Sequence, residues 1–200
     1  MPRKRVVILI SGRGTNMAAL IEGARSPQYP AEVVLVISNR PDAAGLSRAA
    51  EAGIPSAIVD HTAFGDRSAF EAALDAQLVK ARVDIVCFAG FMRILSGNFV
   101  ARWRGRLINI HPSLLPAFPG LSTHASALLA GAQEHGCSVH FVTTEVDRGP
   151  IIAQAVVPVL AGDDPDTLAA RVLAAEHQLY PKALAAVASG GANIDHDCIG

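Results

Sequence analysis

Hydrophobic residues in the first half of the chain form short unbroken runs, separated by segments with helical spacing. The runs span residues 5–11, 33–37, 57–59 and 84–89. They predict buried strands. One helix is expected to begin at about residue 15, a second to end at about residue 52, and a third to begin after Asp66, which can cap a helix. Because apolar strands alternate with helices, we predict an α/β fold with a doubly wound, mostly parallel, Rossmann-like sheet covered on both faces.

The pattern changes after residue 106. A strand at 107–110 is followed by a loop with three prolines, an expected helix at 124–130, and strands at 138–142 and 151–157. Only a turn separates these last two strands, which predicts an antiparallel pair. A closing helix should run from residue 165 to about 188, with Pro181 as the place where it would break. We therefore expect one domain over residues 1–189 and a loose tail over 190–200.

Composition and charge limit the classes of partner. The 200 residues include 17 Lys and Arg against 18 Asp and Glu, and half are hydrophobic. A net charge of −1 gives no broad attraction for nucleic acid or anionic membranes, so we expect neither as a partner. The first apolar run is too short for a secretory signal, and no run reaches the ~20 residues of a membrane span. Three widely spaced cysteines are typical of reduced thiols, so a cytoplasmic location is expected.

The first candidate site is the glycine-containing turn between the first strand and the first helix, Ser11-Gly12-Arg13-Gly14-Thr15-Asn16. At this place in an open parallel sheet, backbone N–H groups and a helix N-terminus face a bound anion. The two glycines allow close approach, while Thr15 and Asn16 add side-chain donors. Met17 replaces the third glycine of the dinucleotide fingerprint, and the Walker A pattern is absent. The turn therefore predicts a phosphate site, with a tight turn that binds nothing as the alternative.

The second candidate is the pair Asn109 and His111 at the carboxyl end of a strand. Strand alternation places both side chains on one side, with Ile110 facing the core. An amide donor beside an imidazole suits acyl transfer, which needs an oxyanion donor and a group that moves protons. A hydrogen-bonded structural histidine is the alternative. Asp147 is either a turn residue before Gly149-Pro150 or a carboxylate that would favour protonated His111 and fix its orientation.

The remaining histidines give weaker signals. His135, Cys137 and His140 lie close in the sequence but lack the paired spacing of a zinc site, so no metal is expected. His140 lies inside an expected strand and is a candidate for lining the site. His61, His135 and His196 are expected to be exposed to solvent.

Four segments of the chain form a recognisable set. They are Ser11-Gly12-Arg13-Gly14-Thr15-Asn16, Ala89-Gly90-Phe91-Met92-Arg93-Ile94-Leu95, Asn109-Ile110-His111-Pro112-Ser113-Leu114-Leu115-Pro116 and Asp147-Arg148-Gly149-Pro150-Ile151. Together they closely resemble the phosphoribosylglycinamide formyltransferase family of purine biosynthesis, over about residues 6–188. The third segment is shared by the wider folate-dependent formyltransferases and indicates only the chemistry. The glycine-containing N-terminal loop in the same chain narrows the range of possible formyl acceptors.

The resemblance implies a metal-free reaction with 10-formyltetrahydrofolate as co-substrate. The amine of glycinamide ribonucleotide attacks the formyl carbon, and a tetrahedral intermediate then gives formylglycinamide ribonucleotide and tetrahydrofolate. In this pattern Asn109 and His111 stabilise the oxyanion and His111 donates a proton. Asp147 supports the protonated imidazole and helps to relay a proton to the departing folate nitrogen. Removal of one oxyanion donor typically costs ~3 kcal/mol.

The resemblance also implies two sets of binding residues, one in each half of the domain. For the ribonucleotide these are Gly12, Arg13, Gly14, Thr15 and Asn16 at the phosphate and Glu176 at the glycinamide end. For the folate they are Arg67, Met92, Arg93, Ile94, Leu95, Asn109, Thr143, Thr144, Glu145, Val146 and Asp147. Without the resemblance, Arg67 and Glu176 would be solvated residues, and Met92, Ile94 and Leu95 would be core.

Some features of the chain depart from the family's pattern or follow from it. Arg13 and Ser122 stand where relatives often have other polar side chains, and Arg13 either strengthens phosphate binding or points to solvent. A cis bond between Leu115 and Pro116 is implied.

The partners expected are small-molecule substrates, and the protein is expected to be a monomer or a homodimer.

Three rival functions share parts of this pattern. A 10-formyltetrahydrofolate hydrolase would use the same three catalytic residues with water, but resembles enzymes that carry an extra N-terminal domain. Methionyl-tRNA formyltransferase needs a second, RNA-contacting domain, for which this chain has no room. A non-catalytic sensor of folate or phosphoribosyl ligands would bind without turnover and tolerate loss of His111.

Overall fold

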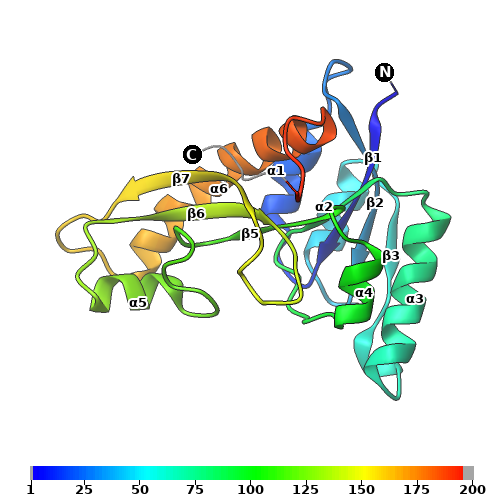
Figure 1. Ribbon diagram of the computed structural model, residues 1–200, viewed down its shortest axis with the longest axis horizontal. Coiled ribbons are helices and arrows are strands. Elements are labelled where there is room, and N and C mark those ends of the chain that lie inside the picture. The colour runs from blue at the N-terminus through cyan, green and yellow to red at the C-terminus, as the bar shows by residue number, and fades with distance from the viewer. Residues whose placement is uncertain (1, 196–200) are drawn as a thin grey trace.

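The computed structural model describes residues 2–195, in which seven strands form one sheet in the order β3-β2-β1-β4-β5-β6-β7 (Figure 1). The strands are β1 (Lys4–Ile10), β2 (Ala31–Ser38), β3 (Ser56–Ile58), β4 (Ile85–Phe88), β5 (Leu107–His111), β6 (Glu134–Phe141) and β7 (Ile151–Pro158). The helices are α1 (Thr15–Gly23), α2 (Gly45–Glu51), α3 (Arg67–Lys80), α4 (Gly97–Arg102), α5 (Thr123–Leu129) and α6 (Pro165–Ala188), with a short 3₁₀ helix, η1 (His61–Ala63).

Strand pairing divides the sheet into a parallel and an antiparallel part. β3, β2, β1, β4 and β5 are parallel to their neighbours, whereas β6 pairs antiparallel with both β5 and β7. The predicted mostly parallel α/β sheet with a C-terminal antiparallel pair is therefore confirmed. The chain order reverses between β1 and β4, and in such sheets ligands bind beyond the carboxyl ends of the strands at this switch point.

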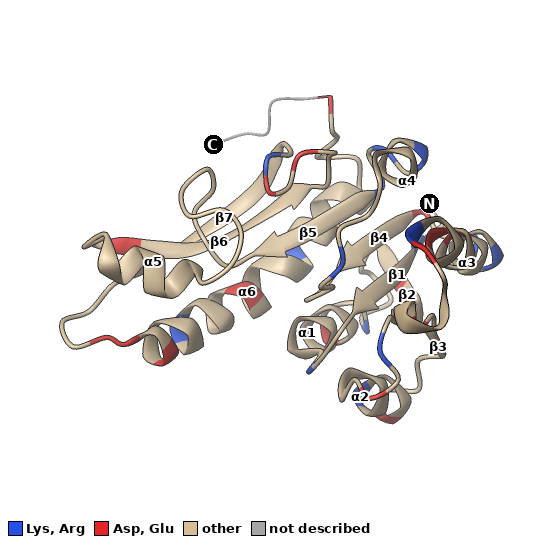
Figure 2. Ribbon diagram, turned by 90° about the horizontal axis from the view of Figure 1, so that it is seen from below, with Lys and Arg blue, Asp and Glu red and all other residues tan. Residues whose placement is uncertain are grey.

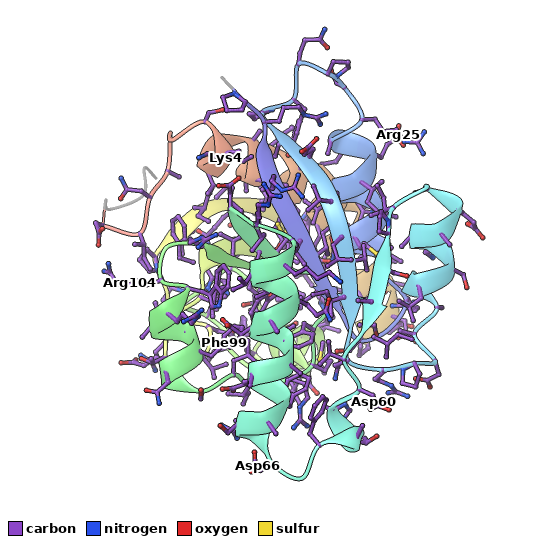
Figure 3. The ribbon with its side chains drawn as sticks, turned by 90° about the vertical axis from the view of Figure 1, so that its right-hand side faces the viewer. Lys4, Arg25, Asp60, Asp66, Phe99 and Arg104 are labelled. Atoms are coloured by element: carbon purple, nitrogen blue, oxygen red, sulfur yellow. The ribbon has the colours of Figure 1, made fainter. Side chains whose placement is uncertain are left out.

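Alternating residues of the central strand face two separate hydrophobic clusters. Val6, Ile8 and Ile10 of β1 pack in a cluster with residues of α1 and α6, whereas Val7 and Leu9 pack in a second cluster with residues of α3 and α4. Figure 3 shows α3 and α4 in front of the sheet, with α1 and α6 behind it. Both faces are thus covered, and the unbroken apolar strands follow from this burial.

Three elements differ from the sequence predictions. The short helix α4 was not predicted, because six residues carry little periodicity; the Ser96 side chain caps it by accepting from Phe99 N. β6 begins at Glu134, four residues before the predicted start. α6 continues through Pro181, with Tyr180 and Leu184 fully buried on either side of the proline. This burial keeps the helix continuous despite the lost backbone hydrogen bond.

The end of the described chain lies against the domain. Ile194 packs on the first hydrophobic cluster, and Arg104 donates to Asp195 over 2.7 Å. The rest of the expected tail, and His196 with it, lies outside the described residues. Charged residues fall mainly on helices and loops (Figure 2). Within residues 2–195, none of the helices combines the length and the apolar character that crossing a membrane requires.

Candidate active site

Two adjoining cavities lie at the carboxyl ends of the parallel strands. The first has a volume of about 750 Å³ and contains the predicted phosphate loop, residues 12–16. The second has a volume of about 640 Å³ and contains Asn109, His111 and Asp147. Both cavities are lined by Gly90, Met92, Arg93, Ile110, Pro112 and His124. Because they share these lining residues, the two cavities lie next to each other.

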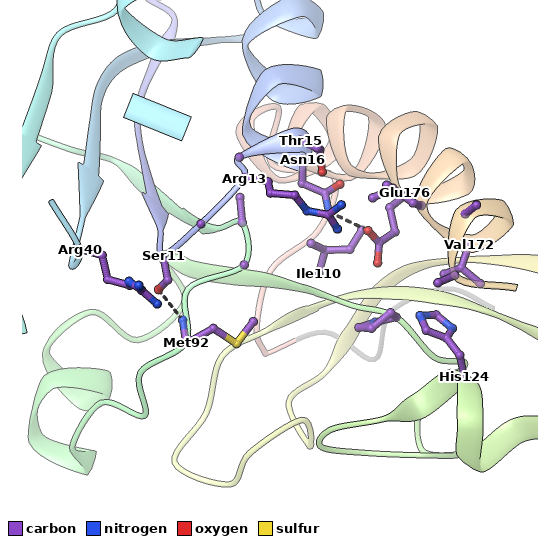
Figure 4. Close-up of a pocket in the computed structure, with 18 of the residues that line it drawn as sticks. Ser11, Arg13, Thr15, Asn16, Arg40, Met92, Ile110, His124, Val172 and Glu176 are labelled. Carbon is purple, nitrogen blue, oxygen red and sulfur yellow. Dashed lines mark hydrogen bonds between the residues drawn. The ribbon is translucent and has the colours of Figure 1, made fainter. Parts of the chain in front are cut away.

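The phosphate loop begins α1 with a glycine whose conformation and close packing disfavour any side chain. Gly14 has a φ of 69° and precedes the first helical residue. A Cβ atom added to Gly14 would lie 2.8 Å from Gly45 Cα, where α2 packs against the loop. Within the described residues, no side chain caps α1, and its first residues, Thr15 and Asn16, line the first cavity (Figure 4). This is the arrangement that binds phosphate groups.

Glu176 also lines the first cavity and projects from α6 next to the phosphate loop (Figure 4). Its carboxylate accepts a hydrogen bond of 2.7 Å from Asn16 Nδ2, and the residue is 5% exposed. Burial raises the pKa of Glu176 above its ordinary value, and the bond from Asn16 opposes this shift. Asn16 Oδ1 is buried and has no hydrogen-bond partner among the described residues. An uncompensated acceptor of this kind is suited to a donor group on a ligand.

Three residues of the second cavity bring together an amide, an imidazole and a carboxylate. Asn109 and His111 project from the same side of β5, as predicted, and both line the cavity. His111 Nδ1 lies 3.4 Å from Asp147 Oδ2, and both side chains are less than a tenth exposed. His111 Nε2 lies 3.1 Å from the carbonyl oxygen of Phe118, which can only accept. Both ring nitrogens of His111 therefore face oxygen atoms.

His140 orients the amide of Asn109. The two residues are opposite each other in the β5–β6 pairing, and Asn109 Nδ2 lies 3.4 Å from His140 Nε2. His140 Nδ1 donates to the Phe141 carbonyl over 2.9 Å, which leaves Nε2 as an acceptor in the neutral ring. Burial lowers the pKa of His140, and the Phe141 carbonyl and Asp147 oppose the shift. The neutral ring thus directs the amide nitrogen of Asn109 toward the site.

Asp147 is held in place by an unusual backbone conformation and by a contact from a distant loop. Its φ is 54°, in the left-handed region that Asp tolerates better than most residues. Gly120 N donates to Asp147 Oδ2 over 3.0 Å. The loop of residues 112–120, which we call the proline loop, therefore contacts both His111 and Asp147. It also contains the implied cis bond between Leu115 and Pro116.

Most of the other predicted residues line one of the two cavities. The second cavity is lined by the predicted folate residues Met92, Arg93, Ile94, Leu95, Thr143, Thr144, Glu145 and Val146. Met92 and Ile94 are each 67% exposed, so the alternative that they are core residues is wrong. Arg67 is exposed at the start of α3 and lies outside both cavities.

Several cavity residues were missed in the sequence. Asn39, Arg40 and His61 line the first cavity, and His124 lines both. The expectation that His61 is exposed is wrong, since its side chain is only 24% exposed where it faces this cavity. Asn39 and Arg40 directly follow β2, so the rule that ligands bind beyond the carboxyl ends of parallel strands could have identified them. Figure 4 shows Arg40 beside Ser11 and Met92. Nothing in the local sequence indicates His124.

The expectation that His135 is exposed is wrong. His135 is 1% exposed because β6 begins early enough to include it. Its Nε2 lies 3.2 Å from His124 Nδ1, and burial lowers the pKa of both histidines. In the part of the chain that the structure describes, no group of three or more His, Cys, Asp or Glu side chains is placed to hold a metal ion.

Comparisons with known proteins agree with this arrangement. The family model described as formyl transferase matches residues 4–184. The chain is 49% identical to the phosphoribosylglycinamide formyltransferase of Escherichia coli, over 92% of this chain and 87% of that protein. It is 56% identical to the trifunctional purine biosynthetic protein adenosine-3 of Drosophila pseudoobscura over 94% of this chain, but it spans only 14% of that protein's length.

A solved structure has the same fold. The crystal structure of phosphoribosylglycinamide formyltransferase from Brucella melitensis is 55% identical and superimposes with a TM-score of 0.91, over 94% of this chain and 97% of that chain. These likenesses confirm the resemblance that the four sequence segments predicted. The chain belongs to the formyl transferase family, in the group of the phosphoribosylglycinamide formyltransferases.

Proposed function

We propose that this protein transfers the formyl group of 10-formyltetrahydrofolate to the amine of glycinamide ribonucleotide, in purine biosynthesis. The observation that carries the proposal is that the two cavities adjoin and have lining residues in common. One contains the phosphate loop, and the other contains Asn109, His111 and Asp147. A transfer between two small molecules needs them in contact beside the reacting side chains. The names of the E. coli and Brucella relatives support this choice of acceptor.

The first cavity suits the ribonucleotide because it presents both donors for a phosphate and a carboxylate for an amine. The phosphate loop and Arg13 offer backbone donors and a positive charge to a phosphate. Glu176 offers a carboxylate at the α6 side, where the amine-bearing glycinamide end would bind. In this orientation the amine points toward Ile110 and Pro112, which belong to both cavities.

The second cavity suits a folate because it combines exposed apolar side chains with backbone and polar groups. Met92 and Ile94 present apolar surface that a planar ring system can cover. The loop of residues 143–147 closes the other side and carries hydrogen-bonding groups. Arg67 stays a prediction for the folate, to be tested by substitution, because it lies outside this cavity.

The side chains of the second cavity have the properties that formyl transfer requires. The Asn109 amide, oriented by His140, can donate to the oxygen on which negative charge develops. His111 faces Asp147 and the Phe118 carbonyl, so its ring can carry a proton on each nitrogen and release one during the reaction. The Asp147 carboxylate balances the positive charge of the His111 ring while that ring carries both protons.

The proposal is tested by an absorbance time course with purified protein and 10-formyl-dideazafolate, with and without glycinamide ribonucleotide. Mass spectrometry then identifies the formylated product. We expect deformylation only with the ribonucleotide, and formyl on its amine. Deformylation at the same rate without the ribonucleotide would indicate a hydrolase. Binding of both ligands without turnover would indicate a sensor, and either result refutes the proposal.

A further inference from the structure

One row of polar side chains crosses the antiparallel part of the sheet. His111 of β5 is opposite Ser138 of β6, and Ser138 is opposite Gln154 of β7. Directly opposed residues in antiparallel strands place their side chains on the same face of the sheet. The row therefore leads from the active-site histidine to an exposed residue on the edge strand, two strands away.

Gln154 uses both of its amide hydrogens behind the proline loop. Its Nε2 donates to the Leu115 carbonyl over 3.0 Å and to Ser138 Oγ over 2.8 Å. Ser138, which is fully buried, donates to the Ser113 carbonyl over 2.7 Å and accepts from Leu115 N over 3.0 Å. All of the hydrogen-bonding capacity of the Ser138 hydroxyl is thus used, and the two side chains fix the middle of the proline loop.

The far end of the same loop holds the reacting side chains. The Phe118 carbonyl contacts His111 Nε2, and Gly120 N donates to Asp147. A displacement of the loop would move the acceptor away from the imidazole and the donor away from the carboxylate. Both contacts therefore depend on where the middle of the proline loop is held.

We propose that Gln154 is a positioning residue for this enzyme: through Ser138 and Leu115 it holds the proline loop in the place where Phe118 and Gly120 orient His111 and Asp147. Gln154 acts on the reaction only through the loop and touches neither substrate cavity. The inference rests on the proposed formyl transfer for its kinetic readout, but not for its spectroscopic one.

The test compares Gln154→Ala with Gln133→Ala. Gln133 is also exposed, and among residues 2–195 its side chain donates only to the Gly131 carbonyl in its own turn, so its replacement removes the same atoms without touching the proline loop. We expect Gln154→Ala to lower kcat about tenfold or more, because small misplacements of reacting groups are costly, and to leave both KM values within about twofold. Gln154→Glu, which keeps the side-chain length but cannot donate when ionised, should do the same.

A second readout does not depend on turnover. In protein labelled with ¹⁵N-histidine, the ring signals of His111 report which nitrogen carries the proton. We expect Gln154→Ala and Gln154→Glu to move these signals toward an average of the two tautomers, and Gln133→Ala to leave them unchanged. Unchanged His111 signals in both Gln154 variants, or kcat values within about twofold of Gln133→Ala, would overturn the inference. If the unaltered protein transfers no formyl group, the proposed function fails and the ring signals alone decide this inference.

Discussion

Substitution of Asp147 by asparagine isolates the effect of one negative charge on the reaction. The shape of the side chain is retained, and the Asn oxygen can still accept from Gly120 N, so the loop keeps its position. The carboxylate charge facing His111 is lost. Because Asp147 and His111 are both less than a tenth exposed, solvent screens their interaction only weakly.

The expected magnitude follows from the distance between the two groups. At the 3.4 Å between His111 Nδ1 and Asp147 Oδ2, an effective dielectric constant of about 20 gives an attraction of about 5 kcal/mol. If the imidazole carries half to all of its positive charge in the transition state, about 2.5 to 5 kcal/mol of stabilisation is lost. We therefore expect kcat to fall by about 10² to several times 10³.

The assay is the ribonucleotide-dependent deformylation of 10-formyl-dideazafolate, with the KM of each substrate measured separately. Asp164→Asn is the matched control, because Asp164 caps α6 through its side chain and asparagine caps helices equally well. The KM for the ribonucleotide should change little, since the phosphate loop is untouched. A kcat within tenfold of the control would refute the role assigned to Asp147 and the electrostatic reasoning behind it.

Three further predictions concern the other groups of the site. Asn109→Ala should lower kcat by about 10² to 10³ in the same assay, as expected for loss of one oxyanion donor, with His140→Asn affecting kcat less. Gly14→Val should raise chiefly the KM for the ribonucleotide, because its side chain would collide with α2, whereas Gly12→Ala, with open space around it, should have a mild effect. Burial raises the pKa of Glu176, so between the ordinary and the raised pKa this carboxyl binds more protons in the folded protein than in the unfolded chain. The free energy of unfolding therefore falls as the pH rises through this interval. Glu176→Gln should remove this part of the pH dependence in urea unfolding.

The local parts of the site could be predicted from the sequence because they depend on neighbouring residues. Strand alternation was enough to place Asn109 and His111 on one side of β5, and the glycine pattern identified the phosphate loop at the start of α1. The approach of Asp147 to His111 could not be derived in this way. It depends on a left-handed backbone at Asp147 and on a contact from Gly120, 27 residues away in the sequence.

The early start of β6 has a similar cause. Gly136 follows three polar residues, Gln133, Glu134 and His135, so the sequence considered alone favours a loop there. In the sheet, a Cβ atom at Gly136 would collide with the carbonyl oxygen of Ala155 on β7, so glycine is required there by a partner strand about 20 residues away. The burial of His135 follows from this pairing, which local sequence does not reveal.

The division of the sheet also separates the two tasks of the protein along the chain. The segment from β5 to the turn before β7 contains Asn109, His111, His140 and Asp147. Its strands β5, β6 and β7 are consecutive in the sequence and adjacent in the sheet. The groups assigned to the ribonucleotide come from the turn after β1 and from α6. Changes confined to those two segments would therefore alter the acceptor and leave the β5–β7 segment as it is. An engineered chimaera could use the same division by joining the β5–β7 segment to another acceptor-binding half.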